Sequence, residues 1–192
     1  MGSRTPPDRL ALLFLGGLVA LFFAPALTLR GVLFFGDAPN YALRLAYTGE
    51  WLRAGHFPLW NPLLSLGAPH AVDIGTQAFY PPHALLSVLL GRRVYDFAAA
   101  FHVLLAAVGT FWLARVLGQS RAAALLAAIA FAFGGFTFGH LQHLNILVAI
   151  AWIPIVLAAT EIPPPHGIAA LRAWRRTGWR AVAERRALSS TH

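Results

Sequence analysis

The sequence contains no cysteine, no lysine and few charged residues of either sign. Without cysteine the chain has no disulfides, thiolate metal sites or cysteine nucleophiles, so any chemistry must use carboxylates, histidine, arginine or hydroxyl groups. Only 11% of the 192 residues are charged and 58% are hydrophobic, whereas soluble domains carry about 25% charged residues. This composition is typical of a membrane protein.

The net charge of +8 comes from fifteen arginines set against seven acidic residues. Nucleic-acid-binding proteins are also basic, but their basic residues share one soluble face with exposed aromatic residues. Here the arginines stand at the edges of apolar runs, so we expect a lipid bilayer as partner and no nucleic acid. The bias toward Ala, Leu and Arg is typical of a GC-rich coding sequence and indicates a bacterial origin.

Four stretches of the sequence are apolar over nearly the length that crosses a bilayer. A helix rises about 1.5 Å per residue and the hydrocarbon core is about 30 Å thick, so a span needs about 20 apolar residues. We expect transmembrane helices at 10–29, 97–117, 122–139 and 144–161. The predicted fold is therefore all-α, a polytopic transmembrane helical bundle of about four spans with a long outer loop that contains short interfacial helices.

The first stretch has a second interpretation, as a cleaved signal peptide. Arg4 and Arg9 precede it, and Ala24-Pro25-Ala26 has the Ala-x-Ala form of a cleavage site. The run is long enough to span, however, and further membrane segments follow it. A retained first helix is the preferred interpretation.

The distribution of arginine predicts the orientation, because short cytoplasmic segments of membrane proteins are enriched in basic residues. Ten of the fifteen arginines lie in 1–9, in the turn at 115–121 and in 162–192. We therefore expect 1–9 to be a cytoplasmic N-terminus, 162–192 a basic cytoplasmic tail and 30–96 an outer loop. The expected location is the bacterial inner (cytoplasmic) membrane, with a multi-pass topology.

Residues 30–96 are too long a connection to be a passive loop. An amphipathic helix is expected at 38–54, where Asp37 can cap it and Pro39 can begin it. A short apolar helix is expected at 82–90, because this segment is too short to span a bilayer. Between the two, proline and glycine recur and exclude long regular elements.

Several local motifs give the chain a resemblance to a known family. They are Phe35-Gly36-Asp37, Gly55-His56-Phe57-Pro58-Leu59-Trp60-Asn61-Pro62, Gly67-Ala68-Pro69, Gln77, Phe79-Tyr80-Pro81-Pro82 and Ala151-Trp152-Ile153-Pro154. In these motifs the chain resembles the YfhO-like bacterial membrane proteins, which belong with the C-type glycosyltransferases. The resemblance covers about residues 10–161.

The resemblance implies transfer of a sugar from a polyprenyl-phosphate donor to a cell-envelope hydroxyl on the outer face. It also implies an acidic residue soon after the first helix that acts as the base or helps to hold a metal, and Asp37 occupies that position. A carboxylate within hydrogen-bond reach can take the acceptor's proton as the glycosidic bond forms. Capping of the following helix is the alternative role for Asp37. The cofactor is unknown, and a divalent metal is the candidate.

Five further loop residues are candidate substrate contacts, and each has a structural alternative. Arg92 and Arg93 lie where the loop re-enters the membrane and can grip the donor phosphate, or they anchor the helix by snorkelling. Trp60 and Asn61 line an acceptor groove or fix the fold of the loop. Asp73 binds a metal, orients the acceptor or is a solvated turn residue.

Three histidines near or within the spans are weaker candidates. His140 and His143 have a spacing that a metal pair or a proton relay could use, but no third ligand is identifiable, so interfacial packing is preferred and no metal site is predicted. His102 lies inside a span, where an ionisable residue is a functional candidate by default. A hydrogen bond from neutral His102 to another helix is the preferred interpretation.

Family members are several times longer and the chain departs from the family from Pro163 onward, so we expect this chain to be an N-terminal fragment. Other interpretations stay open. The chain is a non-enzymatic or degenerate membrane protein that acts as a scaffold, it is an inactive fragment, or it is a small transporter or channel subunit. The scarcity of charge within the spans disfavours the transporter. The sequence alone leaves open whether the chain is an enzyme.

Overall fold

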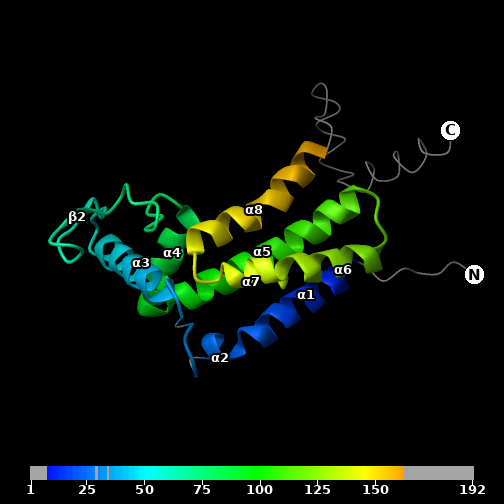
Figure 1. The fold of residues 1–192 in the computed structure, drawn as a ribbon, viewed down its shortest axis with the longest axis horizontal. Helices are drawn as coiled ribbons and strands as arrows, with labels where there is room; N and C mark the ends of the chain where they lie inside the picture. Colours follow the sequence, from blue (N-terminus) through cyan, green and yellow to red (C-terminus); the bar gives the residue numbers. More distant parts are fainter. Residues whose placement is uncertain (1–7, 29, 34, 162–192) are drawn as a thin grey trace, which may run out of the picture.

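The computed structural model describes residues 8–28, 30–33 and 35–161 (Figure 1). The prediction of a helical protein is confirmed. The helices are α1 (Asp8–Phe22), α2 (Ala24–Leu27), α3 (Ala38–Arg53), α4 (Pro81–Leu90), α5 (Val94–Val116), α6 (Arg121–Ala132), α7 (Gly135–Gly139) and α8 (Leu144–Glu161), with a 3-10 turn η1 at Gly91–Arg93. The expected basic tail, and most of the expected cytoplasmic N-terminus, lie outside the described residues.

Among the described residues, three helical segments are long and apolar enough to cross a membrane, namely Pro81–Val116, Arg121–Gly139 and Leu144–Glu161. The expected first span at 10–29 is not one helix. It divides into α1 and α2 next to Pro25, which has no N–H to donate to the carbonyl four residues before it. Helix α1 alone has 15 residues, fewer than the roughly 20 that a span needs.

Helix α5 lies at the centre of the bundle, with α8 on one side and α6 and α1 on the other (Figure 1). Its buried surface is made mostly of small side chains, which let helix backbones approach closely. These buried alanines are Ala98, Ala99, Ala100, Ala106, Ala107 and Ala114. At Gly109 an added Cβ would lie 2.7 Å from Cγ1 of Ile155, so α8 packs directly on the α5 backbone there.

An ion-pair network around Asp8 joins the helices at one end of the bundle. We refer to this end of the bundle as the Asp8 end. Oδ1 of Asp8 lies 3.0 Å from Nε of Arg121 and 3.7 Å from Nε of Arg115. These contacts link the start of α1 to the end of α5 and the start of α6. All three side chains are partly buried, so water screens their charges less than on an open surface.

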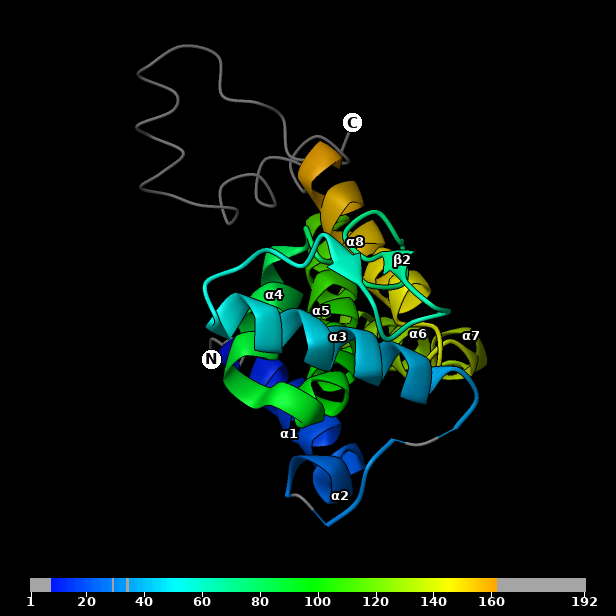
Figure 2. The same cartoon turned by 90° about the vertical axis from the view of Figure 1, so that its left-hand side faces the viewer.

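Helix α3 crosses the opposite end of the bundle, and we refer to it as the α3 end. Figure 2 looks onto this end and shows α3 passing in front of α5. Helix α3 packs on α4, η1 and α5, and it contacts α4 so closely that a Cβ on Gly49 would lie 2.2 Å from the carbonyl oxygen of Ser87. The loop between α3 and α4 contains the antiparallel strands β1 (Trp60–Asn61) and β2 (Ala68–Pro69).

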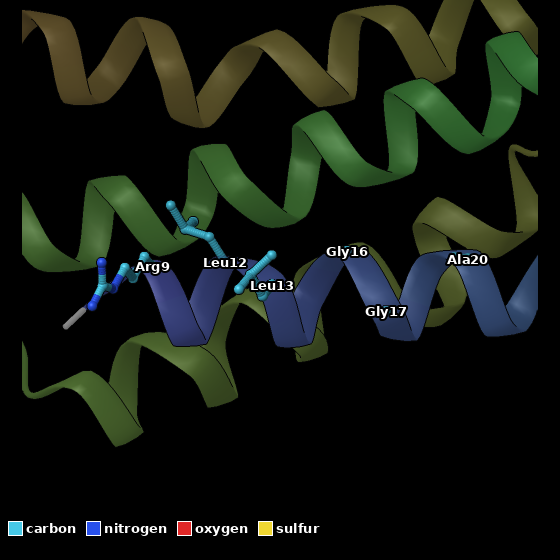
Figure 3. Close-up of a pocket in the computed structure, with 6 residues that line it drawn as sticks. All are labelled: Arg9, Leu12, Leu13, Gly16, Gly17 and Ala20. Carbon is cyan, nitrogen blue, oxygen red and sulfur yellow. The ribbon is translucent and has the colours of Figure 1, made fainter. Parts of the chain in front are cut away.

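An open apolar groove of about 540 Å³ runs along the exposed face of α1 (Figure 3). Its lining residues are Arg9, Leu12, Leu13, Gly16, Gly17 and Ala20. A Cβ added to Gly16 or to Gly17 would meet nothing within 4 Å. These glycines therefore differ from Gly109, whose missing side chain makes room for another helix.

This contrast gives a test of the packing around α5. We expect Gly109→Leu to destabilise the chain by about 1–3 kcal/mol, because the added side chain forces α5 and α8 apart. Gly17→Leu is the matched control, and it should leave the stability unchanged or slightly raised, since leucine favours a helix more than glycine does. Thermal unfolding of both variants in detergent checks the prediction. Equal destabilisation by the two substitutions would contradict it.

Candidate functional site

Asp37 stands at the N-cap position of α3, but its side chain makes no capping hydrogen bond. The carboxylate is 57% exposed, and Oδ2 lies 3.5 Å from Nε2 of His143. In the described part of the chain no hydrogen-bond partner is found for Oδ1. The capping role considered from the sequence is therefore wrong, and the carboxylate is open to a ligand.

The surroundings of Asp37 join the first turn of α3 to the first turn of α8. The hydroxyl of Tyr41 donates a hydrogen bond of 2.7 Å to Oδ1 of Asn145. Gly36, just before Asp37, has φ +50, a conformation that favours glycine, and its Cα lies against the side chain of Gln142, which would have to move for any larger residue. We refer to Asp37, Tyr41, His143 and Asn145 as the Asp37 cluster.

Tyr41 acts as a hydrogen-bond donor in the cluster. Burial, and to a smaller extent the negative charge of Asp37, raise the pKa of Tyr41 above its ordinary 10.0. The phenol therefore stays protonated and holds Asn145 at neutral pH. The hydrogen bond between Tyr41 and Asn145 fixes α3 against α8 beside Asp37.

The described residues near Asp37 do not supply a closed set of protein ligands for a divalent metal. Within the described residues, no group of three His, Cys, Asp or Glu side chains is placed to hold a metal. The His140 ring lies 5.5 Å from that of His143, but its Nδ1 is used in a hydrogen bond of 2.8 Å to the carbonyl of Phe136. Asp37 and His143 alone supply fewer ligands than a closed metal site needs.

A second feature of the α3 end is an open cleft of about 500 Å³ between α3 and residues 61–64, and we refer to it as the α3 cleft. Its charged lining residues are Arg44, Glu50 and Arg92, and Asn61 also lines it. Two of the residues predicted to bind substrate, Arg92 and Asn61, thus face one cavity. Asn61 is 6% exposed, and its Oδ1 accepts a hydrogen bond from the Leu63 N–H at 2.9 Å.

Trp60 and Asp73 lie beside the α3 cleft, and each contacts a residue that lines it. Trp60 is 52% exposed, and its backbone carbonyl accepts a hydrogen bond of 2.8 Å from the Tyr47 hydroxyl. Asp73 pairs with Arg44, with Oδ2 at 3.1 Å from Nη1, and its Oδ1 accepts the Gly75 N–H at 2.7 Å. Asp73 is therefore an ion-paired turn residue in this structure.

Arg93 is not among the residues that line the cleft. Its side chain instead links two segments of the chain. Its Nη2 donates hydrogen bonds to the carbonyls of Ala26 at 2.7 Å and Gly31 at 2.8 Å, and lies 3.5 Å from Oδ2 of Asp96. Asp96 in turn accepts the Leu33 N–H at 2.9 Å. Arg93 therefore ties the segment after α1 to the start of α5, whereas the neighbouring Arg92 is exposed.

Sequence reasoning missed His70, which fixes the irregular loop to α3. The Thr48 hydroxyl donates to the carbonyl of Arg44 at 3.0 Å, so its oxygen accepts from Nε2 of His70 at 2.9 Å. His70 is 1% exposed, and burial lowers its pKa below the ordinary 6.5. No spacing rule joins these two residues, which lie 22 positions apart.

Within the described residues, His102 does not bond directly to another helix, as its position suggested, but is linked to α8 through Tyr80, the residue just before α4. Its Nδ1 lies 2.7 Å from the carbonyl of Ala98, which can only accept, so Nδ1 donates. Nε2 of the neutral ring then accepts from the Tyr80 hydroxyl at 3.0 Å. The Tyr80 oxygen itself accepts from Nε1 of Trp152 in α8 at 2.8 Å. Tyr80 therefore connects α5 with α8, and the chain of bonds explains the buried histidine structurally.

Comparison of the chain with protein-family models, with curated proteins and with solved structures finds no match.

The contact between His70 and Thr48 predicts that acid loosens the loop. Because the folded pKa of His70 lies below the unfolded value of 6.5, its contribution to stability is complete above pH 6.5 and is lost as the pH falls through the lowered folded pKa. Hydrogen exchange of the amides at 68–76 should therefore accelerate between pH 7 and pH 5, after correction for the intrinsic pH dependence. His70→Gln should reduce this change, and His56→Gln, at an exposed histidine, should preserve it. An unchanged acid response in His70→Gln would refute the assignment.

The two adjacent arginines should differ in their effect on stability. Arg93→Gln removes charge-assisted hydrogen bonds to two carbonyls, each worth about 1.5–3 kcal/mol, so a clear fall in unfolding temperature is expected. Arg92→Gln at the exposed position should change stability by no more than about 0.5 kcal/mol. Differential scanning fluorimetry in detergent compares them. A larger loss from Arg92→Gln would show that the two roles are reversed.

Proposed function

We propose that this chain is the N-terminal portion of a YfhO-like, C-type glycosyltransferase-like membrane protein that transfers a sugar from a polyprenyl-phosphate donor to a cell-envelope acceptor on the outer face. The observation that carries the proposal is the state of Asp37. Its carboxylate is exposed, makes no capping bond and is held beside His143 at the end of the helical bundle. A general base needs a carboxylate that is accessible to the substrate and held in place by a neighbouring group.

The proposal includes four spans, of which α1 and α2 together form the first. Backbone hydrogen bonds that continue across the break support this, from Phe23 N–H to the carbonyl of Val19 at 2.9 Å and from Leu27 N–H to that of Phe23 at 2.8 Å. In the proposed orientation the Asp8 end, where the short turn with Arg115 and Arg121 lies, is cytoplasmic and the α3 end is external, because short cytoplasmic turns are enriched in basic residues. The membrane is then the bacterial inner membrane.

In the proposed reaction the acceptor hydroxyl oxygen attacks the anomeric carbon of the donor sugar. The bond from that carbon to the phosphate oxygen breaks, and polyprenyl phosphate leaves with the electron pair. The proton of the hydroxyl passes to Asp37. His143 faces Oδ2 of Asp37 and positions the carboxylate, which leaves Oδ1 for the acceptor. The transfer of a proton at a positioned carboxylate typically contributes about 10²–10⁴-fold to a rate.

A non-enzymatic scaffold is the second candidate function, and the loop between α3 and α4 favours it. This loop exposes several large apolar side chains, with exposed fractions of 84% for Leu63, 79% for Val72 and 77% for Ile74. Leu66 is fully exposed and has φ +65, a conformation that a leucine rarely adopts. A partner protein that covers these side chains would explain their exposure.

Substitution of Asp37 separates the two functions. With the chain reconstituted in liposomes and a radiolabelled polyprenyl-phosphate sugar as donor, Asp37→Asn should lower sugar transfer to an envelope polymer by at least about 100-fold. The exposed Arg30→Gln is the control and should stay within twofold of the unmodified chain. Full transfer by Asp37→Asn would exclude Asp37 as the base. No transfer by the unmodified chain would favour the scaffold.

A further inference from the structure

The α3 cleft contains two opposite charges that the protein itself leaves unpaired. Glu50 and Arg92 both line it and both are exposed. Within the described residues, neither side chain takes part in a salt bridge or a hydrogen bond, so their charged atoms are more than 4.0 Å apart. The other arginines near the cleft already have partners within the protein. Arg44 pairs with Asp73, and Arg53 donates to the carbonyls of Ser87 and Val88.

The charge balance of the cleft favours a ligand that carries both signs. The pair of Arg44 and Asp73 is neutral, and Glu50 and Arg92 cancel each other, so the lining as a whole attracts neither a simple anion nor a simple cation. A ligand with separated positive and negative groups can satisfy Glu50 and Arg92 together. An arginine can bind a phosphate with two parallel hydrogen bonds, and a carboxylate accepts hydrogen bonds from a primary ammonium.

The cleft also offers an apolar surface beside these charges. Leu43 is 71% exposed and Leu63 is 84% exposed, and both line it. Arg92 lies in η1, two residues before α5 begins at Val94, and α3 crosses the end of the bundle (Figure 2). The cleft therefore lies where the helices end, which is the level of lipid headgroups in a spanning bundle.

We propose that the α3 cleft binds the phosphoethanolamine headgroup of a membrane phospholipid. Arg92 binds the phosphate, Glu50 accepts hydrogen bonds from the ammonium group, and Leu43 and Leu63 contact the glycerol and the first acyl carbons. A choline headgroup is a poorer ligand, because its trimethylammonium group has no N–H to donate. A glycerol headgroup has no positive charge for Glu50. This site is independent of sugar transfer and of Asp37.

Binding of short-chain lipids to the full chain tests the site. The probes are dihexanoyl phosphatidylethanolamine, phosphatidylcholine and phosphatidylglycerol, with free phosphoethanolamine as a fourth, and binding is measured by native mass spectrometry from a maltoside detergent. We expect at least fivefold tighter binding of phosphatidylethanolamine than of the other three. Glu50→Gln should abolish the preference of the chain for phosphatidylethanolamine over phosphatidylglycerol. Arg92→Gln should weaken the binding of all three lipids at least fivefold, and Arg30→Gln should change nothing.

Three results would overturn the proposal. Equal affinities of the unmodified chain for the three lipids would show that the headgroup is not recognised. Free phosphoethanolamine that binds as tightly as the lipid would identify a soluble ligand instead of a membrane lipid. Loss of binding in Arg30→Gln equal to that in Arg92→Gln would indicate a general effect of positive charge.

Discussion

The close packing of α5 against its neighbours is the constraint on which the rest of the structure depends. Alanines and Gly109 bring α6 and α8 against the α5 backbone, which is how helices associate where apolar burial alone cannot drive them together. At the start of α5, Arg93 and Asp96 bind carbonyl and amide groups of the segment after α1. Helix α3 rests on the same end of α5, so the positions of Asp37 and His143 are both set by the bundle.

The α3 end shows how an irregular loop can be held in place without long regular elements. Its backbone has few ladder hydrogen bonds, and buried backbone groups still need partners. Side chains of α3 supply many of the contacts. Tyr47 binds the carbonyl of Trp60, Thr48 binds His70, and Arg44 binds Asp73. The α3 cleft therefore has walls fixed to a helix, which favours a preformed binding surface over one that orders only on contact with a ligand.

The sequence predicts the elements of this fold better than their contacts. Uninterrupted apolar runs indicate α5, α6 and α8, and the prolines at 39 and 81–82 indicate where α3 and α4 begin. The break next to Pro25 differs from the single helix predicted at 10–29, because apolar length alone does not reveal where a missing proline N–H interrupts a helix. Asp37 was identified through a family resemblance, but its contact with His143 joins residues 106 positions apart, which no local pattern encodes. Arg92 and Arg93 are adjacent and chemically identical, so only their orientation on η1 separates an exposed arginine from one that holds two carbonyls.

The placement of α3 against α8 is central to the proposed function, because this contact positions Asp37 beside His143. The absence of cysteine makes the contact directly measurable. In the double variant Asp37→Cys with His143→Cys, a short bismaleimide added to membranes should join the two thiols within one chain and protect them from a later thiol label. The pair Asp8→Cys with Asp37→Cys, at opposite ends of the bundle, should stay unlinked. Free labelling of both thiols in the first pair, at the level of the second, would contradict the account.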